Sequence, residues 1–338
     1  MGDPHTDDAL ARRAATLHAA SVVIDAHSDI LMGLTDGTCG WEDGQPERPT
    51  DSGCDRQVSL RLLGEGGVTS QVFAVFTAPF DVDYRIVRPE YAAATLPRAL
   101  AMLATFHEGL ARYPDRLRLT TTAAEIRRAK ADGVVAGILG IEGLDPMGHD
   151  LRLLRLFRSL GVTTVSLTWS NRNPLADGSS TAARPGGLTP LGEEVVAELE
   201  RLRMLIDLAH LGPTATEEVL ERATKPLFVS HTRLRDDAWA RTLRRVGEGG
   251  GVACAIFYKV PTVAVLVDQI EQLIELCGPR GVGLGADFYG TVHAPAEVQT
   301  VAGFPRITEE LLRRGHDDDV VQGILGENVL RLYGEVVG

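Results

Sequence analysis

The sequence predicts an α/β fold, a (β/α)₈ TIM-like barrel with closing C-terminal helices, and two observations favour it. Eight short segments are rich in Val, Ile, Leu and Phe and alternate little with polar residues. Strands buried on both faces, as in a parallel barrel, have this composition. Segments with apolar residues spaced three and four apart, typical of amphipathic helices, lie between most of them. We therefore predict one barrel domain over residues 1–338.

The predicted strands follow one another along the whole chain. In order, they are Ser21–Asp29, Thr69–Phe76, Val134–Gly143, Thr163–Trp169, Met204–His210, Pro226–His231, Gly251–Phe257 and Gly281–Phe288. The helical patterns between them are Ala123–Ala131, Asp150–Leu160, Leu191–Leu202, Thr214–Ala223 and Val265–Cys277. An open doubly wound sheet is the alternative. It is less favoured because the sequence has no Gly-rich phosphate loop and because polar residues follow many strands, not one switch point.

Helices are also predicted at both ends of the chain, and long connections interrupt the pattern. The terminal helices are Asp7–Ala20, Ile307–Arg314, Asp317–Leu325 and Glu327–Val337. The long connections are Ile30–Gly66, Thr77–Pro97 (with Tyr84, Arg85 and Arg88) and Asn171–Thr189. Each follows a predicted strand, so we expect all three on the active face of the barrel, where they would shape a pocket.

The composition is that of a globular protein with an acidic balance. Hydrophobic residues make up 44% of the chain, charged residues 24%, and the net charge is −12. This charge argues against nucleic acid or an anionic membrane as a partner. No apolar segment approaches the roughly 20 residues that span a bilayer, and the N-terminus lacks a signal-peptide pattern. We predict a cytoplasmic protein whose four cysteines are free thiols.

Six polar residues stand at the carboxyl ends of predicted strands, where β/α barrels collect catalytic groups. They are His27, Asp29, Glu142, His210, His231 and Asp287. Each alone has an ordinary structural explanation, such as a buried histidine or an aspartate that caps a loop. Six at one edge are hard to explain by packing, so we interpret them as a catalytic site.

The residue types favour a site for two metal ions. His27 and Asp29 are two residues apart, so in a strand they would point to the same side and reach one cation together. Glu142 has two carboxylate oxygens and could bridge this cation to a second one, held by His210 and His231. Mixed imidazole and carboxylate ligands suit two Zn²⁺ best, with Mn²⁺ or Co²⁺ possible.

Asp287 is the candidate for proton transfer. It would accept a proton from the water that the ions activate and deliver it to the leaving amine. Together with the bridging Glu142 it makes up the predicted catalytic pair. The alternative for Asp287 is a cap for the loop after the last strand.

The motifs and their order resemble the membrane (renal) dipeptidase family of metallopeptidases (peptidase family M19, in the amidohydrolase-like superfamily) over nearly the whole chain. The stretches that carry the resemblance are IDAHSD, GVTSQVFAVF, GIEG, GVTTVSLTWSNRNPLADG, GLTPLGEEVV, MLIDLAH, PLFVSH, GVGLGADFYG and GENVLRLY. The resemblance implies a β/α barrel, a dinuclear zinc site and hydrolysis of dipeptides. It implies metal roles for His27, Asp29, Glu142, His210 and His231, and proton transfer by Asp287.

Two departures from the family pattern lie on the substrate side. Many members have a histidine after the Leu-Thr of the fourth strand, which helps to hold the substrate carbonyl. Here this residue is Trp169, whose indole N–H can donate a hydrogen bond but cannot carry a proton. Many members also have an Arg-Asn pair after the sixth strand, and its arginine binds the substrate carboxylate. That segment is shortened here, and of Arg233, Arg235 and Arg241 we favour Arg241.

The sequence thus predicts a zinc-dependent dipeptidase in which a water bridging two metal ions attacks the peptide bond. The first alternative is a hydrolase with the same metal site whose substrate is an N-acyl amino acid, a cysteinyl conjugate or a biosynthetic intermediate. The second is a non-catalytic binding protein on the same barrel, against which the complete ligand set argues. By analogy with the family, a homodimer is also expected.

Overall fold

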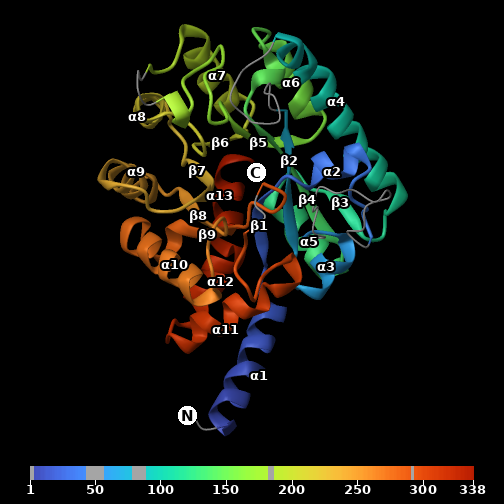
Figure 1. Ribbon diagram of the computed structural model, residues 1–338, viewed down its shortest axis with the longest axis vertical. Helices are drawn as coiled ribbons and strands as arrows, with labels where there is room; N and C mark the ends of the chain where they lie inside the picture. Colours follow the sequence, from blue (N-terminus) through green and yellow to red (C-terminus); the bar gives the residue numbers. More distant parts are fainter. Residues whose placement is uncertain (1–3, 43–56, 78–88, 182–185, 291–292) are drawn as a thin grey trace.

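Eight parallel strands form a nearly closed barrel, and their order in the sheet follows their order in the chain (Figure 1). The computed structural model describes residues 4–42, 57–77, 89–181, 186–290 and 293–338. The barrel strands are β1 (Ile24–Ser28), β2 (Ser70–Phe76), β4 (Val135–Glu142), β5 (Val162–Ser166), β6 (Leu205–Asp207), β7 (Phe228–Thr232), β8 (Val252–Ile256) and β9 (Val282–Gly285). A parallel bridge between Ser28 and Phe288 joins the last segment to the first. The predicted TIM-like fold class is confirmed.

Helices surround the strands (Figure 1). They are α1 (Pro4–Ala20), α2 (Ile30–Asp36), α3 (Leu60–Glu65), α4 (Pro89–Arg112), α5 (Ala123–Asp132), α6 (Arg152–Ser159), α7 (Pro190–Arg201), α8 (Pro213–Arg222), α9 (Asp237–Glu248), α10 (Val263–Cys277), α11 (Pro305–Arg313), α12 (Asp318–Gln322) and α13 (Asn328–Val336). Short polar side chains start several of them. Thr122, Thr189, Asp236 and Thr262 each accept a hydrogen bond from a backbone N–H in the first turn, worth about 1 kcal/mol each.

Parts of the expected loops are helical. Within the predicted connection Ile30–Gly66 the chain forms α2 and α3, and the hydroxyl of Ser59 caps α3 by accepting from the N–H of Leu62. The end of the connection Thr77–Pro97 belongs to α4. Its Tyr84, Arg85 and Arg88 lie outside the described residues. A short strand, β3 (Leu117–Leu119), pairs with the start of β4 and was not predicted.

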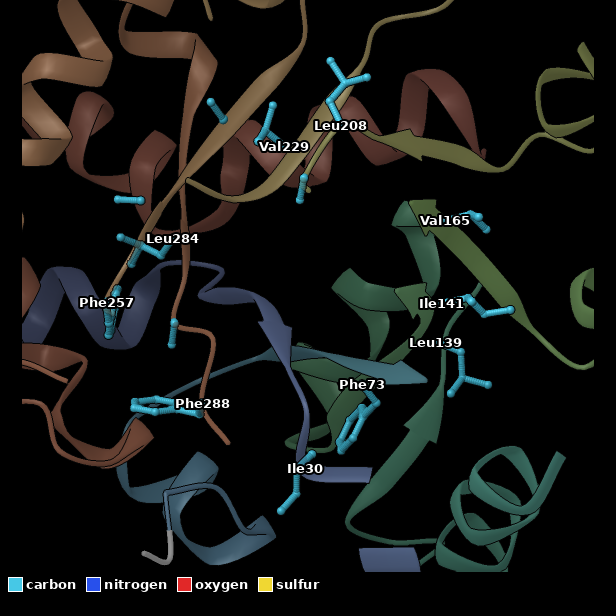
Figure 2. Packing of buried hydrophobic residues seen from close by; sticks show 14 of the residues in the cluster. Ile30, Phe73, Leu139, Ile141, Val165, Leu208, Val229, Phe257, Leu284 and Phe288 are labelled. Atoms are coloured by element: carbon cyan, nitrogen blue, oxygen red, sulfur yellow. The ribbon is translucent and has the colours of Figure 1, made fainter. Parts of the chain in front are cut away.

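The side chains of β4 alternate between two apolar clusters. Ala136 and Ile138 belong to a cluster that also contains residues of α13. Leu139 and Ile141 belong to the larger cluster between the strands and the surrounding helices (Figure 2). Glu142 continues the series of Ala136 and Ile138, because alternate residues of a strand share a face. This alternation directs Glu142 toward the barrel interior.

The C-terminal helices close the end of the barrel at which the strands begin. The side-chain amide of Asn328 donates to the carbonyl of Val282, the first residue of β9, at 2.8 Å. The buried hydroxyl of Tyr333 donates to Oγ1 of Thr163, near the start of β5, at 2.7 Å. The predicted closing helices are therefore present. They leave the carboxyl ends of the strands for a functional site.

Two further expectations concern membranes and thiols. In the described ranges, no helix has both the length and the apolar character needed to cross a bilayer. Cys254 and Cys277 are buried free thiols. Cys54 lies outside the described residues.

Candidate active site

The six predicted residues meet at the carboxyl end of the barrel, around Glu142. On one side of Glu142, Nε2 of His27 lies 3.6 Å from Oε2 of Glu142, 3.8 Å from Oδ2 of Asp29 and 4.0 Å from Oδ1 of Asp287. His27, Asp29 and Glu142 are nearly inaccessible to solvent, whereas the side chain of Asp287 is 15% exposed. Three carboxylates thus converge on one imidazole.

Two more histidines approach the other oxygen of Glu142. Its Oε1 lies 3.1 Å from Nε2 of His210 and 3.8 Å from Nε2 of His231. These two nitrogens lie 2.8 Å apart. The opposite ring nitrogens are held by serine hydroxyls at 2.9 Å, His210 by Ser170 and His231 by Ser230. Histidines whose second nitrogen is hydrogen-bonded in this way have a fixed ring orientation, as metal-binding histidines do.

Irregularities in two strands aim the histidines. The pairing register of β1 shifts between Asp25 and Ser28, the interval that contains His27. The register of β7 shifts between Val229 and Thr232, the interval that contains His231. Such bulges redirect side chains near active sites. The regular alternation of side chains that the sequence predicts for a strand does not include these two changes of side-chain direction.

The other three predicted residues lie beyond their strands. β6 ends at Asp207, and His210 follows in a turn with φ 62°. β9 ends at Gly285, and Asp287 has φ 59°. Asp29 stands at the start of α2 and not within β1. Left-handed backbone at residues other than glycine is uncommon and concentrates at functional sites.

Gly143 allows the chain to turn directly after Glu142. Its φ is 80°, in the left-handed region that favours glycine. A Cβ at this position would lie 2.9 Å from the backbone nitrogen of Trp169. The close approach of the two segments therefore requires glycine in the GIEG motif.

At His27 and Glu142, the charges of neighbouring site residues shift the pKa more strongly than burial does. Burial alone would lower the pKa of His27, but Glu142 and Asp29 hold this pKa well above its usual range. Burial alone would raise the pKa of Glu142, but His27 and His210 hold it well below its usual range. The proton on His27 therefore balances the surrounding carboxylates, as a bound cation would.

At His231 and Asp287 the environment favours the neutral form. Burial holds the pKa of His231 well below its usual range, and the neighbouring His27 and His210 add to this effect. Burial, together with the carboxylates of Asp29 and Glu142, holds the pKa of Asp287 well above its usual range despite the nearby His27. Neutral His231 thus has a lone pair that can bind a cation, and Asp287 holds a proton more readily than an ordinary carboxyl group.

Two atoms of the predicted metal ligands are buried without a hydrogen-bond partner among the described residues, Nε2 of His27 and Oδ1 of Asp29. Buried polar atoms are nearly always paired. Two groups of ligand atoms have their members within 4.8 Å of one another: His27, Glu142 and His231, and His27, Asp29 and Asp287. This donor set can hold a divalent cation.

Two buried aspartates tie the ligand-bearing segments together. Oδ1 of Asp25 accepts from the backbone N–H of Ala286, beside Asp287, at 2.8 Å. Oδ1 of Asp207 accepts from the N–H groups of Ala209 and Ser230 at 2.9 Å each. Burial raises the pKa of Asp25 to about 6. These contacts make Asp207 a support for the residues beside His210 and His231.

Sequence reasoning overlooked Asp25 and the two serines. Ser230 directly precedes His231, and Ser170 directly follows Trp169. Their positions next to predicted site residues could have indicated that they belong to the site. Asp25 stands in the same IDAHSD motif as His27.

Comparison with known proteins identifies the family of the chain. The profile of the membrane dipeptidase family (peptidase family M19) matches residues 11–337. The chain belongs to this family. Dipeptidase aclJ of Aspergillus oryzae is 30% identical over 308 residues, which cover 83% of this chain and 70% of that protein. Dipeptidase verJ of Clonostachys rogersoniana is 27% identical over 98% of this chain and 88% of its own length.

A solved metallopeptidase structure is similar over most of the chain. It is a metallopeptidase from Rhodobacter sphaeroides, bound to a phosphinate mimic of the dipeptide L-Ala-D-Ala. The similarity has a TM-score of 0.81 at 26% sequence identity and covers 94% of this chain and 99% of that one. The predicted family is confirmed, and with it an enzyme of the metallo-dipeptidase type.

Trp169, the first departure from the family pattern, packs against the site. The centroid of its ring lies 5.4 Å from that of Phe76 and 5.7 Å from that of His210. Together with Ser170, the indole therefore flanks the His210 imidazole.

The second departure concerns the arginines after β7. A cavity of about 130 Å³ beside the two histidines is lined by Ala209, His210, His231, Thr232, Arg233, Arg235, Trp239, Ile256 and Tyr258. Arg241, which we favoured for the substrate carboxylate, is an exposed residue of α9 and does not line this cavity. The geometry favours Arg233 and Arg235 over Arg241.

Proposed function

We propose that this protein is a zinc-dependent dipeptidase whose site holds two divalent ions. The residues that would hold them are His27, Asp29, Glu142, His210 and His231, with Glu142 shared between the two ions. The observation that carries the proposal is the pair of buried, unpartnered atoms, Nε2 of His27 and Oδ1 of Asp29, beside the Glu142 carboxylate. Imidazoles mixed with carboxylates suit Zn²⁺, with Mn²⁺ or Co²⁺ as alternatives. When bound, such ions lower the pKa of water and polarise a carbonyl.

Asp287 is the proposed proton carrier of the reaction. Its raised pKa allows the carboxyl group to keep a proton taken from the attacking water. The same group then donates this proton to the leaving nitrogen. Its side chain is more exposed than those of His27 and Glu142, so it can reach a substrate.

Arg233 and Arg235 are the proposed contacts of the substrate carboxylate, in place of Arg241. Both line the cavity that begins at His210 and His231. An arginine binds a carboxylate through two parallel hydrogen bonds. The dipeptide mimic bound to the Rhodobacter sphaeroides relative supports a substrate with a free carboxylate.

The decisive experiment measures metal content and hydrolysis together. Purified protein is loaded with Zn²⁺ or Mn²⁺ and assayed on L-Ala-L-Ala and L-Ala-D-Ala. Glu142→Gln is expected to lose bound metal and at least about 100-fold of the activity. Glu193→Gln, a surface change on α7, serves as the matched control. The proposal is wrong if Glu142→Gln keeps both its metal and full activity.

Trp169 stands where many members of the family have a histidine, and this difference favours testing a second substrate class. An indole beside His210 changes the pocket wall, and N-acyl amino acids also carry a free carboxylate. A parallel assay with N-acetyl amino acids separates the two classes. Turnover of these compounds alone would replace the dipeptide as the substrate.

We also propose that the protein is cytoplasmic and forms a homodimer. Fractionation of cells that express the tagged chain checks the first. Light scattering of the eluted protein checks the second.

A further inference from the structure

Two cationic side chains line the cavity beside His231, and a third lies against the ring of Tyr258, a residue of the cavity wall. Arg233 and Arg235 line it, together with Tyr258. Lys259 follows Tyr258, and its Nζ lies 4.9 Å from the centroid of the Tyr258 ring. We call Arg233, Arg235 and Lys259 the cationic rim. It stands out in a chain whose net charge is −12.

Aromatic rings, not carboxylates, hold the cationic rim. Cζ of Arg235 lies 4.0 Å from the ring centroid of Trp239. Cζ of Arg233 lies 6.0 Å from that of Tyr258, and its Nη1 donates to the Tyr258 carbonyl at 3.2 Å. In the part of the chain that the structure describes, no carboxylate forms an ion pair with any of the three. By contrast, the described arginines Arg98, Arg127 and Arg314 each pair with one or more carboxylates.

The rings of the cavity are themselves fixed. The indole N–H of the buried Trp239 donates to Oγ1 of Thr232 at 2.9 Å, and the N-cap Asp236 accepts from the Trp239 backbone N–H. The turn that carries Lys259 is held by its backbone N–H, which donates to the His293 carbonyl at 2.9 Å. The cations therefore stand on preorganised supports, which lowers the entropy cost of binding an anion.

The arrangement places like charges close together. Although Arg235 is exposed as a residue, its guanidinium is partly desolvated, which lowers its pKa. The nearby Asp236 carboxylate opposes this lowering, and the charge of Arg233 adds to it. One monovalent carboxylate can satisfy one guanidinium in a bidentate contact. A second negative charge on the substrate would neutralise a further cation of the rim.

We propose that the cavity receives the C-terminal residue of the dipeptide and selects aspartate or glutamate there. One carboxylate of that residue is the α-carboxylate, and its side-chain carboxylate meets the remaining cations of the rim. This inference rests on the proposed dipeptidase function and specifies its substrate class. Ile256 and Trp239 give the cavity an apolar wall for the methylene groups of such a side chain.

The test compares dipeptides that differ in charge but hardly in size. The metal-loaded protein is assayed on Ala-Glu against Ala-Gln, on Ala-Asp against Ala-Asn, and on Ala-Ala, each with the L and the D second residue. We expect kcat/KM for the acidic member of a pair to exceed that of its amide at least about 10-fold. The ratio should fall as ionic strength rises, because salt screens partly exposed charges.

Substitutions test whether the cationic rim causes the preference for Ala-Glu over Ala-Gln. Lys259→Met is expected to reduce the Glu-to-Gln ratio about 3-fold or more, since it removes one of the rim charges. Arg244→Met, the same type of change at an exposed position of α9 away from the cavity, should leave the ratio unchanged.

Each outcome decides between the inference and the function on which it rests. Equal or better turnover of the amides, or hydrolysis of Ala-Ala without turnover of Ala-Glu and Ala-Asp, overturns the acidic preference and leaves the dipeptidase proposal standing. A Lys259→Met variant with an unchanged ratio also overturns it. No hydrolysis of any dipeptide by the metal-loaded protein overturns both.

Discussion

Oδ1 of Asp207 accepts a hydrogen bond from the backbone N–H of Ser230 at 2.9 Å and thereby links β6 to β7. The ladder between these two strands consists of the single pair Asp207 and Phe228. The Asp207 carboxylate therefore adds a hydrogen bond between β6 and β7, where the ladder has only this one residue pair. It also accepts from the N–H of Ala209, so it fixes the neighbours of both His210 and His231.

Asp207→Ala should loosen this link and the histidines that depend on it. Two buried N–H groups lose their acceptor, and we expect a loss of about 2–4 kcal/mol in the free energy of unfolding. We also expect about 10- to 100-fold weaker metal binding, the usual effect of removing a support of metal ligands. Urea unfolding of the metal-free protein and zinc titration measure the two effects.

Asp207→Asn is the matched variant, because its amide oxygen can still accept from both N–H groups. It should recover most of the metal affinity that Asp207→Ala loses. Equal metal affinity of Asp207→Ala and the wild type would show that the link does not position the histidines.

The ring of Trp169 should matter more than its N–H group. Trp169→Phe keeps an aromatic face against Phe76 and His210, and Trp169→Ala removes it. Aromatic pairs contribute about 0.5–1.5 kcal/mol, so we expect Trp169→Ala to lower kcat/KM about 2- to 10-fold and Trp169→Phe to lower it less. Steady-state kinetics on one dipeptide measures this. An equal loss in both variants would instead indicate a hydrogen bond from the indole N–H to the substrate.

Much of the fold could be predicted because its signals are local. A strand buried on both faces is a nearly continuous apolar run, so all eight barrel strands were predicted. α4 was missed as an element, because its first residues fall in the predicted connection Thr77–Pro97. β3 has only three residues, too few for a reliable pattern.

The candidate site shows where sequence reasoning stops. The six residues could be found because each follows an apolar run, yet the bulges that aim His27 and His231 depend on neighbouring strands. Arg241 was favoured from its place in the chain, but which arginine lines the cavity depends on where α9 begins. Contacts between distant segments, such as Asp25 with Ala286, leave no pattern in one sequence.

Arg235→Met should weaken substrate binding more than Arg241→Met does. The guanidinium of Arg235 lies over Trp239 at the cavity, whereas Arg241 is exposed on α9. Loss of a charge-assisted contact costs about 1.5–3 kcal/mol, so KM for a dipeptide should rise at least about 10-fold in Arg235→Met. The reverse order of the two variants would restore Arg241 as the carboxylate contact.

Binding of a divalent metal ion near pH 7 should release protons. Without metal, the carboxylates hold the pKa of His27 well above its usual range, so this imidazole is protonated at neutral pH. Zinc requires the neutral form, and the proton must leave. Calorimetric titration in two buffers of different ionisation enthalpy counts the released protons. His27→Gln should release fewer, and an unchanged count would show that the proton resides elsewhere.

His18, far from the site, should make the stability of the fold depend on pH. It is buried between α1 and α11, where Nδ1 lies 2.7 Å from Oγ1 of Thr308 and Nε2 lies 2.8 Å from the Gly66 carbonyl. The carbonyl can only accept, so Nε2 carries the hydrogen and Nδ1 accepts from the threonine hydroxyl. Burial lowers the pKa of His18, although the Gly66 carbonyl opposes this.

The sign of the pH effect follows from this lowered pKa. In the unfolded chain His18 takes up a proton below about pH 6.5, whereas in the folded protein it stays neutral until a lower pH. Its contribution is therefore fully present above about pH 6.5 and is lost as the pH falls toward the folded pKa, by up to about 1.4 kcal/mol per pH unit.

His18→Gln isolates this contribution, because its amide can still donate to the Gly66 carbonyl but does not titrate. The variant should be less stable than the wild type at pH 8, and the difference should shrink at pH 5.5. Urea unfolding of the metal-free proteins at both pH values measures it, since metal binding would add its own pH dependence. A difference that stays constant or grows on acidification would mean that the folded protein protonates His18 at least as readily as the unfolded chain does.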